Sequence, residues 1–141
     1  MTATKIRKPT FKHVESELYH FHDTLREIDE IRKNIMHCRT NEDENTGGGR
    51  GSYISDPTAQ IGTRLATHKK LNRLEEIADA INRVYEALPP ERQKLIKLKY
   101  WTRPQLKTWD GIALELNVSR RQAMRWRDEI VTAVSEIVGW R

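Results

Sequence analysis

The chain of 141 residues is long enough for one domain, or for one small domain with an appendage. It is 37% hydrophobic and 32% charged, it has no apolar run that could cross a membrane, and its first residues lack the apolar stretch of a secretory signal. The single cysteine, Cys38, cannot form an internal disulfide, so we expect a reducing, cytoplasmic environment.

All of the net charge of +5 is carried by the C-terminal third of the chain. Residues 1–90 contain 14 Lys and Arg against 14 Asp and Glu, whereas residues 91–141 contain 11 against 6. A basic excess confined to one segment indicates contact with a polyanion there. A solvated basic surface without a partner has the same composition, so charge alone leaves both interpretations open.

Residues 1–38 are predicted to form one long helix. Pro9 suits its first turn, where a missing backbone N–H costs nothing. Apolar residues then recur at the near-heptad spacing of a coiled coil, at Phe11, Val14, Leu18, Phe21, Leu25, Ile28, Ile31 and Ile35. A narrow apolar stripe with charged flanks is typical of a helix that packs on one partner.

Residues 39–56 interrupt this pattern and are predicted to form a Gly-rich loop, with Gly47-Gly48-Gly49-Arg50-Gly51 at its centre. The spaced glycines followed by Lys and Ser or Thr that bind nucleotide phosphates are absent, so we interpret the segment as a linker.

A second long helix is predicted over residues 57–88. Asp56-Pro57 is a good helix start, and Pro89-Pro90 ends the helix. Two long amphipathic helices joined by a glycine loop predict an antiparallel helical hairpin. Neither narrow stripe makes a large core alone, so we expect the hairpin to form a homodimer or to contact a partner protein.

Residues 89–141 are predicted to form a compact helical domain with helices at 91–101, 109–116 and 119–138. No strand-like alternation occurs anywhere, so the predicted fold is all-α. Ile112, Leu116, Ala123 and Trp126 have the spacing of a core between the last two helices.

The junction of those two helices has the residues of a helix-turn-helix. Ala113 is small where the helices would cross, and Asn117 tolerates the left-handed conformation of a tight turn. Val118 would fill the corner, and Ser119 is an N-cap for the second helix. The spacing therefore predicts a motif whose second helix enters the major groove of double-stranded DNA.

The candidate DNA-binding residues follow from that geometry. Arginine can pair with guanine and glutamine with adenine, while Lys107, Ser119 and the helix N-terminus would meet phosphates. The residues expected at the groove are Arg120, Arg121, Gln122, Met124 and Arg125.

Other site chemistry is not indicated. The five histidines do not form a Cys/His zinc pattern, and no nucleophile elbow, paired-carboxylate site or nucleotide fingerprint occurs. We therefore expect neither enzyme activity nor a metal or cofactor. The tryptophans fall on apolar helical positions, which favours core packing over base stacking.

Two resemblances extend this interpretation. Leu88-Pro89-Pro90-Glu91-Arg92 and Leu98-Lys99-Tyr100-Trp101, followed by the predicted helix-turn-helix, are similar to region 4 of sigma factors. In that family, this region reads a promoter element. No counterpart of the region that opens the promoter is visible, so the chain is not a complete sigma factor.

Nearly the whole chain resembles the RinA family of phage transcriptional activators. The resemblance is carried by Gly47-Gly48-Gly49-Arg50, Ser55-Asp56-Pro57-Thr58, Lys99-Tyr100-Trp101, Thr108-Trp109-Asp110-Gly111-Ile112-Ala113 and Trp126-Arg127-Asp128-Glu129-Ile130. It implies a phage or prophage protein that activates late packaging and morphogenesis genes in a bacterial host cell, with RNA polymerase as a candidate partner.

Two other functions stay open. A small terminase subunit that binds a packaging site also joins a helix-turn-helix to long helices, and it would form a large ring. A nuclease is the third hypothesis, although no metal-binding carboxylate cluster is visible in the sequence.

Overall fold

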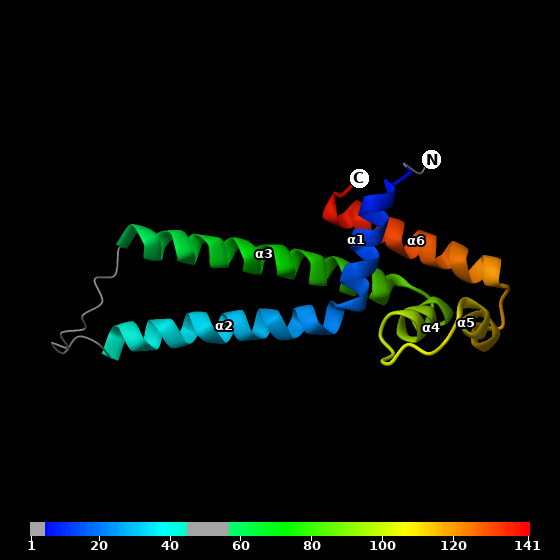
Figure 1. Ribbon diagram of the computed structural model, residues 1–141, viewed down its shortest axis with the longest axis horizontal. Coiled ribbons are helices and arrows are strands. Elements are labelled where there is room, and N and C mark those ends of the chain that lie inside the picture. Colours follow the sequence, from blue (N-terminus) through cyan, green and yellow to red (C-terminus); the bar gives the residue numbers. More distant parts are fainter. Residues whose placement is uncertain (1–4, 45–56) are drawn as a thin grey trace. The chain divides into compact units, whose positions relative to one another are not determined.

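The computed structural model describes the backbone of residues 5–44 and 57–141 and the side chains of residues 5–36 and 62–141. Every regular element in this part of the chain is a helix, which confirms the predicted all-α fold. None of the described helices is both long and apolar enough to cross a bilayer. The helices in Figure 1 are α1 (Lys8–Tyr19), α2 (Phe21–Glu44), α3 (Pro57–Ala87), α4 (Pro90–Lys99), α5 (Trp109–Leu116) and α6 (Arg120–Val138).

The chain divides into two compact units. Unit 1 comprises Met1–His22 and Ile77–Arg141, and unit 2 comprises Asp23–Glu76. Unit 1 therefore contains α1 and the last turns of α3 in addition to residues 89–141, which the sequence analysis treats as a separate domain.

The structure has two helices where the sequence predicts one over residues 1–38. The break lies at His20, whose backbone has φ −100° and ψ 11°. Both the backbone N–H and the ring Nδ1 of His20 lie within hydrogen-bond distance of the Ser16 carbonyl, at 3.1 and 2.7 Å. A side chain that competes for a helix carbonyl in this way helps to end the helix without Gly or Pro.

The second of these helices also extends beyond the predicted boundary. A loop is predicted from residue 39, but α2 continues to Glu44. Residues 39–44 contain neither Gly nor Pro, so nothing in them forces the backbone out of the helix. The Gly-rich segment itself lies outside the described residues.

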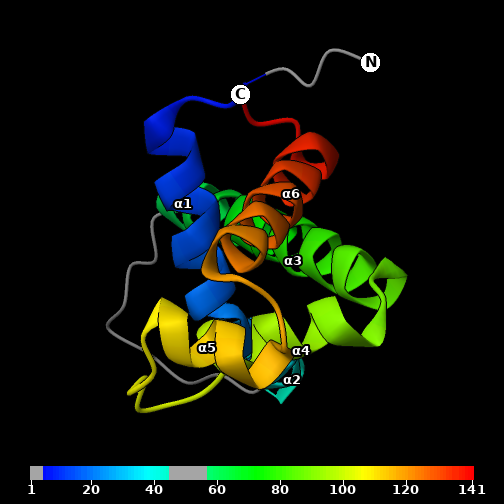
Figure 2. The same ribbon diagram turned by 90° about the vertical axis from the view of Figure 1, so that its right-hand side faces the viewer.

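The core of unit 1 is built around α6. This helix packs against α5, α1 and α4 (Figure 2). Its inward side chains Ala123, Ile130, Val131 and Val134 are at most 2% exposed. The other elements of unit 1 contribute further buried residues, namely Val14, Leu18, Ile77, Ala80, Ile81, Leu95, Ile96, Tyr100 and Ile112.

Helix α1 is held in this core by polar as well as apolar contacts. The Tyr100 hydroxyl donates to a carboxylate oxygen of Glu15 over 2.8 Å, and the Trp101 indole N–H donates to the Leu18 carbonyl over 3.2 Å. The Trp101 ring also stacks on Phe21, with centroids 5.2 Å apart. Aromatic residues after α4 thus fix the position of the N-terminal helix within unit 1.

The C-terminal residues close over the same helix. The Trp140 ring stacks on His13, with centroids 4.3 Å apart and an interplanar angle of 11°. The Thr10 hydroxyl donates to the Arg141 carbonyl. Gly139 has φ 83°, a conformation that glycine adopts without strain, and it turns the chain at the end of α6. Both ends of the chain therefore belong to unit 1.

The described part of unit 2 consists of segments of two helices. Its α2 and α3 segments run in opposite directions (Figure 1) and are joined by the ion pairs Arg32–Glu75 and Lys70–Glu27, at 2.6 and 2.7 Å. The predicted apolar stripe is only partly buried, because Ile28 is 5% exposed but Leu25 is 43% exposed. Thr24, 6% exposed, is buried instead of its neighbour Leu25, so the burial does not keep the heptad spacing.

Candidate nucleic-acid interface

The predicted turn residues join α5 to α6. Asn117 has φ 56° and ψ 37°, the left-handed conformation expected from its position. The N–H groups of Asn117 and Val118 donate to the carbonyls of Leu114 and Ala113, over 3.2 and 3.1 Å. These bonds satisfy backbone carbonyl groups at the end of α5 and fix the direction in which the next helix begins.

Both helices begin at a side-chain cap. The Ser119 hydroxyl accepts a hydrogen bond from the Gln122 N–H over 3.1 Å, as predicted for an N-cap. The Thr108 hydroxyl accepts from the Gly111 N–H over 3.3 Å and caps α5 in the same way. Capping defines where α6 begins, so the backbone positions from which the side chains of its first turns project are fixed.

The inward face of α6 determines which side chains remain outside. Ala123 is fully buried and Trp126 is 9% exposed, as their spacing predicts. Arg92 lies over the Trp126 ring, with its guanidinium carbon 5.5 Å from the ring centroid. Because this face is anchored, the opposite face of the first two turns points to solvent.

The predicted groove residues occupy that opposite face and its edges. Arg120, Arg121 and Arg125 are exposed, whereas Gln122 and Met124 are half-buried. Arg120 lies near Asp110 of α5, with Nε and Oδ1 3.9 Å apart. No ion pair joins Arg121 or Arg125 to any described residue, so their charges are not neutralised within this part of the chain.

Lys107 lies apart from these residues, in the segment before α5. Its ammonium group pairs with the Glu115 carboxylate of α5. The segment is fixed by Gln105, whose side-chain amide donates to the carbonyls of Leu98 and Lys99 at the end of α4. Lys107 is therefore in an ion pair that a phosphate would have to replace.

Arg127 has a different position from the other arginines of α6. Its guanidinium carbon lies 5.2 Å from the centroids of both the Phe11 and Trp109 rings, and Nη2 lies 2.9 Å from Asp128 Oδ1. The residue connects α1, α5 and α6. Its place on the apolar side of the helix, four residues after Ala123, is the sequence signal that separates it from Arg125.

Unit 1 carries the positive charge of the protein. It contains 16 Lys and Arg against 10 Asp and Glu, a net charge of +6, whereas unit 2 contains 9 against 10. In the sequence, the excess falls on residues 91–141 alone. The structure adds to the same unit the exposed cations Lys5, Arg7, Lys8 and Lys12.

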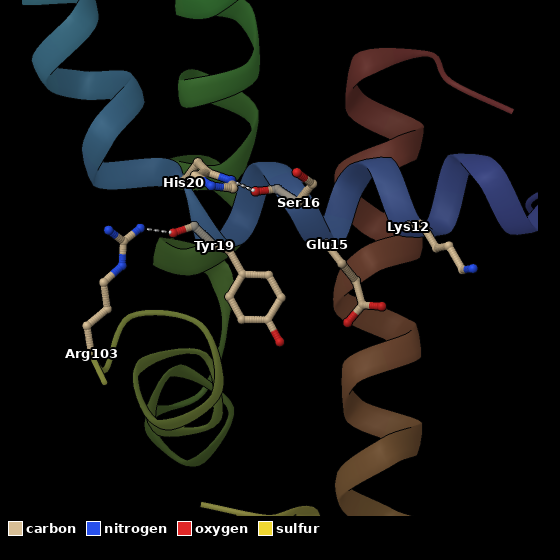
Figure 3. Close-up of a pocket in the computed structure, with 6 residues that line it drawn as sticks. All are labelled: Lys12, Glu15, Ser16, Tyr19, His20 and Arg103. Atoms are coloured by element: carbon tan, nitrogen blue, oxygen red, sulfur yellow. Dashed lines mark hydrogen bonds between the residues drawn. The ribbon is translucent and has the colours of Figure 1, made fainter. Parts of the chain in front are cut away.

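An open pocket of about 560 Å³ lies beside α1 (Figure 3). Lys12, Glu15, Ser16, Tyr19, His20 and Arg103 line it. The Arg103 guanidinium donates to the Tyr19 carbonyl over 2.8 Å, which joins α1 to the segment after α4. None of the residues predicted to contact DNA lines this pocket.

Residues 18–136 match the family described as a protein of unknown function (DUF722). No curated protein and no solved structure matches the chain.

Proposed function

The chain belongs to the DUF722 family, and we propose that it binds double-stranded DNA at a specific sequence and activates transcription of phage or prophage genes. The observation that carries the proposal is the start of α6. There, Arg121 and Arg125 are exposed and not neutralised by described residues, on a helix whose N-terminus is capped and whose other face is anchored.

The left-handed turn and the two capped helices support interpreting α5 and α6 as a helix-turn-helix. In such motifs, the first turns of the second helix meet base edges in the major groove. Arg121 and Arg125 would read guanine, and Gln122 would read adenine. Ser119 and the helix N-terminus would contact phosphate, as would Lys107 after exchange of its ion pair with Glu115.

The activating role rests on the resemblance to the RinA family. In that case, the protein acts in the cytoplasm of a bacterial host cell and turns on late packaging and morphogenesis genes. The α2–α3 pair would then form a homodimer or contact RNA polymerase. The partly exposed apolar residues Leu25 and Leu65, 43% and 65% exposed, support a role for this pair in protein contact.

A promoter–reporter assay tests the proposal directly. The protein is supplied in trans, with genomic fragments from either side of its own gene placed before the reporter. We expect induction from one fragment, and the variant Arg121→Ala/Arg125→Ala should abolish it. The variant Arg73→Ala/Arg83→Ala removes the same charge from exposed positions of α3 and should leave induction unchanged.

Binding of the active fragment is measured in parallel with the purified chain. Each arginine that reads a base should contribute about 1–3 kcal/mol to specific binding. Equal affinities of the wild type and the Arg121→Ala/Arg125→Ala variant would contradict the proposed interface. Binding without induction from any fragment would instead favour repression or a packaging role.

A small terminase subunit is the second candidate. The observation in its favour is the combination of the long helices α2 and α3, with 24 and 31 residues, and a basic helical unit. A packaging subunit would assemble into a ring of many copies. Light scattering of the purified chain separates the two, because a monomer or dimer favours the activator.

A further inference from the structure

The outward face of α6 changes sign along its length. Arg121, Arg125 and Glu129 follow one another at a spacing of four residues and are all exposed, so they lie on one face of the helix. The first two are positive and the third is negative. A carboxylate in line with groove-reading arginines would face the phosphate backbone, and like charges brought together in this way oppose association.

Arg92 of α4 lies against that carboxylate. Its Nη1 atom is 2.6 Å from Glu129 Oε2, and its guanidinium lies over the Trp126 ring. The Arg92 side chain is 32% exposed and that of Glu129 is 49% exposed. The aromatic ring restricts the arginine, so this ion pair needs less ordering than a pair of two mobile surface side chains.

The second acidic residue of this part of α6 is paired as well. Asp128 Oδ1 lies 2.9 Å from Nη2 of Arg127, whose guanidinium is in turn fixed by the Phe11 and Trp109 rings. Asp128 and Glu129, the two acidic residues that come next after Arg125, thus each pair with an arginine that lies over an aromatic ring. This shared arrangement favours a role in charge neutralisation over chance contact at the surface.

We propose that Arg92 is a positioning residue for DNA binding: it neutralises Glu129 and thereby lets the arginine face of α6 approach the duplex. This inference rests on the proposed function, because it needs DNA at α6. It differs from a direct phosphate contact by Arg92, for which the carboxylate would be irrelevant. It also differs from a purely structural link between α4 and α6.

The test is a comparison of affinities in the full chain. The probe is a labelled duplex of about 30 base pairs, long enough for two half-sites one helical turn apart, which the wild type enriches from a random-sequence library. Fluorescence anisotropy gives the Kd of Arg92→Ala, Glu129→Gln, the double variant Arg92→Ala/Glu129→Gln and Arg92→Lys. Arg83→Ala is the matched control, since it removes an arginine from the ion pair with Asp79 on α3.

Arg92→Ala should weaken binding about five- to tenfold, because an uncompensated charge is left beside DNA. Removal of the carboxylate as well should bring the affinity of the double variant back to within about twofold of Glu129→Gln. Arg92→Lys keeps the positive charge but loses the planar group that lies over Trp126, so its Kd should lie between those of the wild type and Arg92→Ala. Arg83→Ala should bind like the wild type.

Two results overturn the inference while the proposed function stands. One is an Arg92→Ala affinity equal to that of Arg83→Ala, and the other is a double variant as weak as Arg92→Ala. If circular dichroism shows that Arg92→Ala has lost helix, the affinity of Glu129→Gln is the deciding measurement. Weaker DNA binding by Glu129→Gln than by the wild type would contradict the inference. Failure of the wild type to enrich any duplex refutes the proposed function and this inference together.

Discussion

The hydroxyl of Tyr100 at the end of α4 donates to a carboxylate oxygen of Glu15 on α1, over 2.8 Å. The two residues are 85 positions apart in the sequence, and Tyr100 is only 1% exposed. Burial, followed by the negative charge of Glu15, raises the pKa of Tyr100 far above its usual value near 10. The bond ties the first helix to the unit that holds the candidate DNA interface.

The raised pKa of Tyr100 predicts alkaline destabilisation. Above pH ~10 the unfolded chain loses the tyrosine proton while the folded chain keeps it. The contribution of Tyr100 to the stability of the folded chain is therefore complete below pH ~10 and declines as the pH rises. The wild-type free energy of unfolding should fall by about 1.4 kcal/mol per pH unit above that point from this one group. Urea unfolding of the wild type and Tyr100→Phe between about pH 8 and 11 isolates the effect of Tyr100 ionisation. If the free energies of unfolding of the two proteins change in parallel with pH, this effect is ruled out.

Loss of a buried side chain from α1 should destabilise unit 1. Leu18 is fully buried, so Leu18→Ala should lower the free energy of unfolding by about 2–5 kcal/mol. Leu25→Ala is the matched control, since it makes the same change seven residues later in the predicted heptad stripe but at a 43% exposed position. It should cost less than about 1 kcal/mol. Equal losses in thermal or urea unfolding would support a continuous heptad helix instead.

The turn between α5 and α6 depends on the left-handed conformation of Asn117. Its φ of 56° disfavours a β-branched residue, so Asn117→Val should destabilise the chain by about 1–2 kcal/mol. Asn117→Gly should be close to neutral, because glycine adopts this conformation without a steric penalty. Unfolding curves in which the valine and glycine variants coincide would show that the turn does not need this conformation.

The cap of α6 offers a way to separate stability from DNA binding. Ser119→Ala removes the acceptor for the Gln122 N–H and should cost about 1 kcal/mol of stability. Ser119→Asp keeps a cap of similar strength, but it places a carboxylate where a phosphate is expected. We expect wild-type stability and strongly weakened DNA binding from Ser119→Asp. Tight binding by this variant would exclude the N-terminus of α6 from the interface.

The local features of the last helices could be predicted from the sequence alone. The apolar periodicity, the N-cap Ser119 and the turn residue Asn117 each act on residues close to them in the sequence. For this reason α5 and α6 begin and end close to their predicted limits. The exposed set Arg120, Arg121 and Arg125 follows from helical spacing once Ala123 and Trp126 are assigned to the core.

The tertiary structure alone decided where α1 belongs and which charges are neutralised. Residues 1–38 have a continuous apolar pattern that does not predict the break at His20, and packing against α6 and the aromatic residues after α4 places the separate helix α1 in unit 1. Likewise, the spacing of Lys107 and Glu129 does not reveal their partners Glu115 and Arg92. Periodicity specifies which face of a helix is apolar, whereas long-range contacts determine what covers that face and which arginines remain available for DNA.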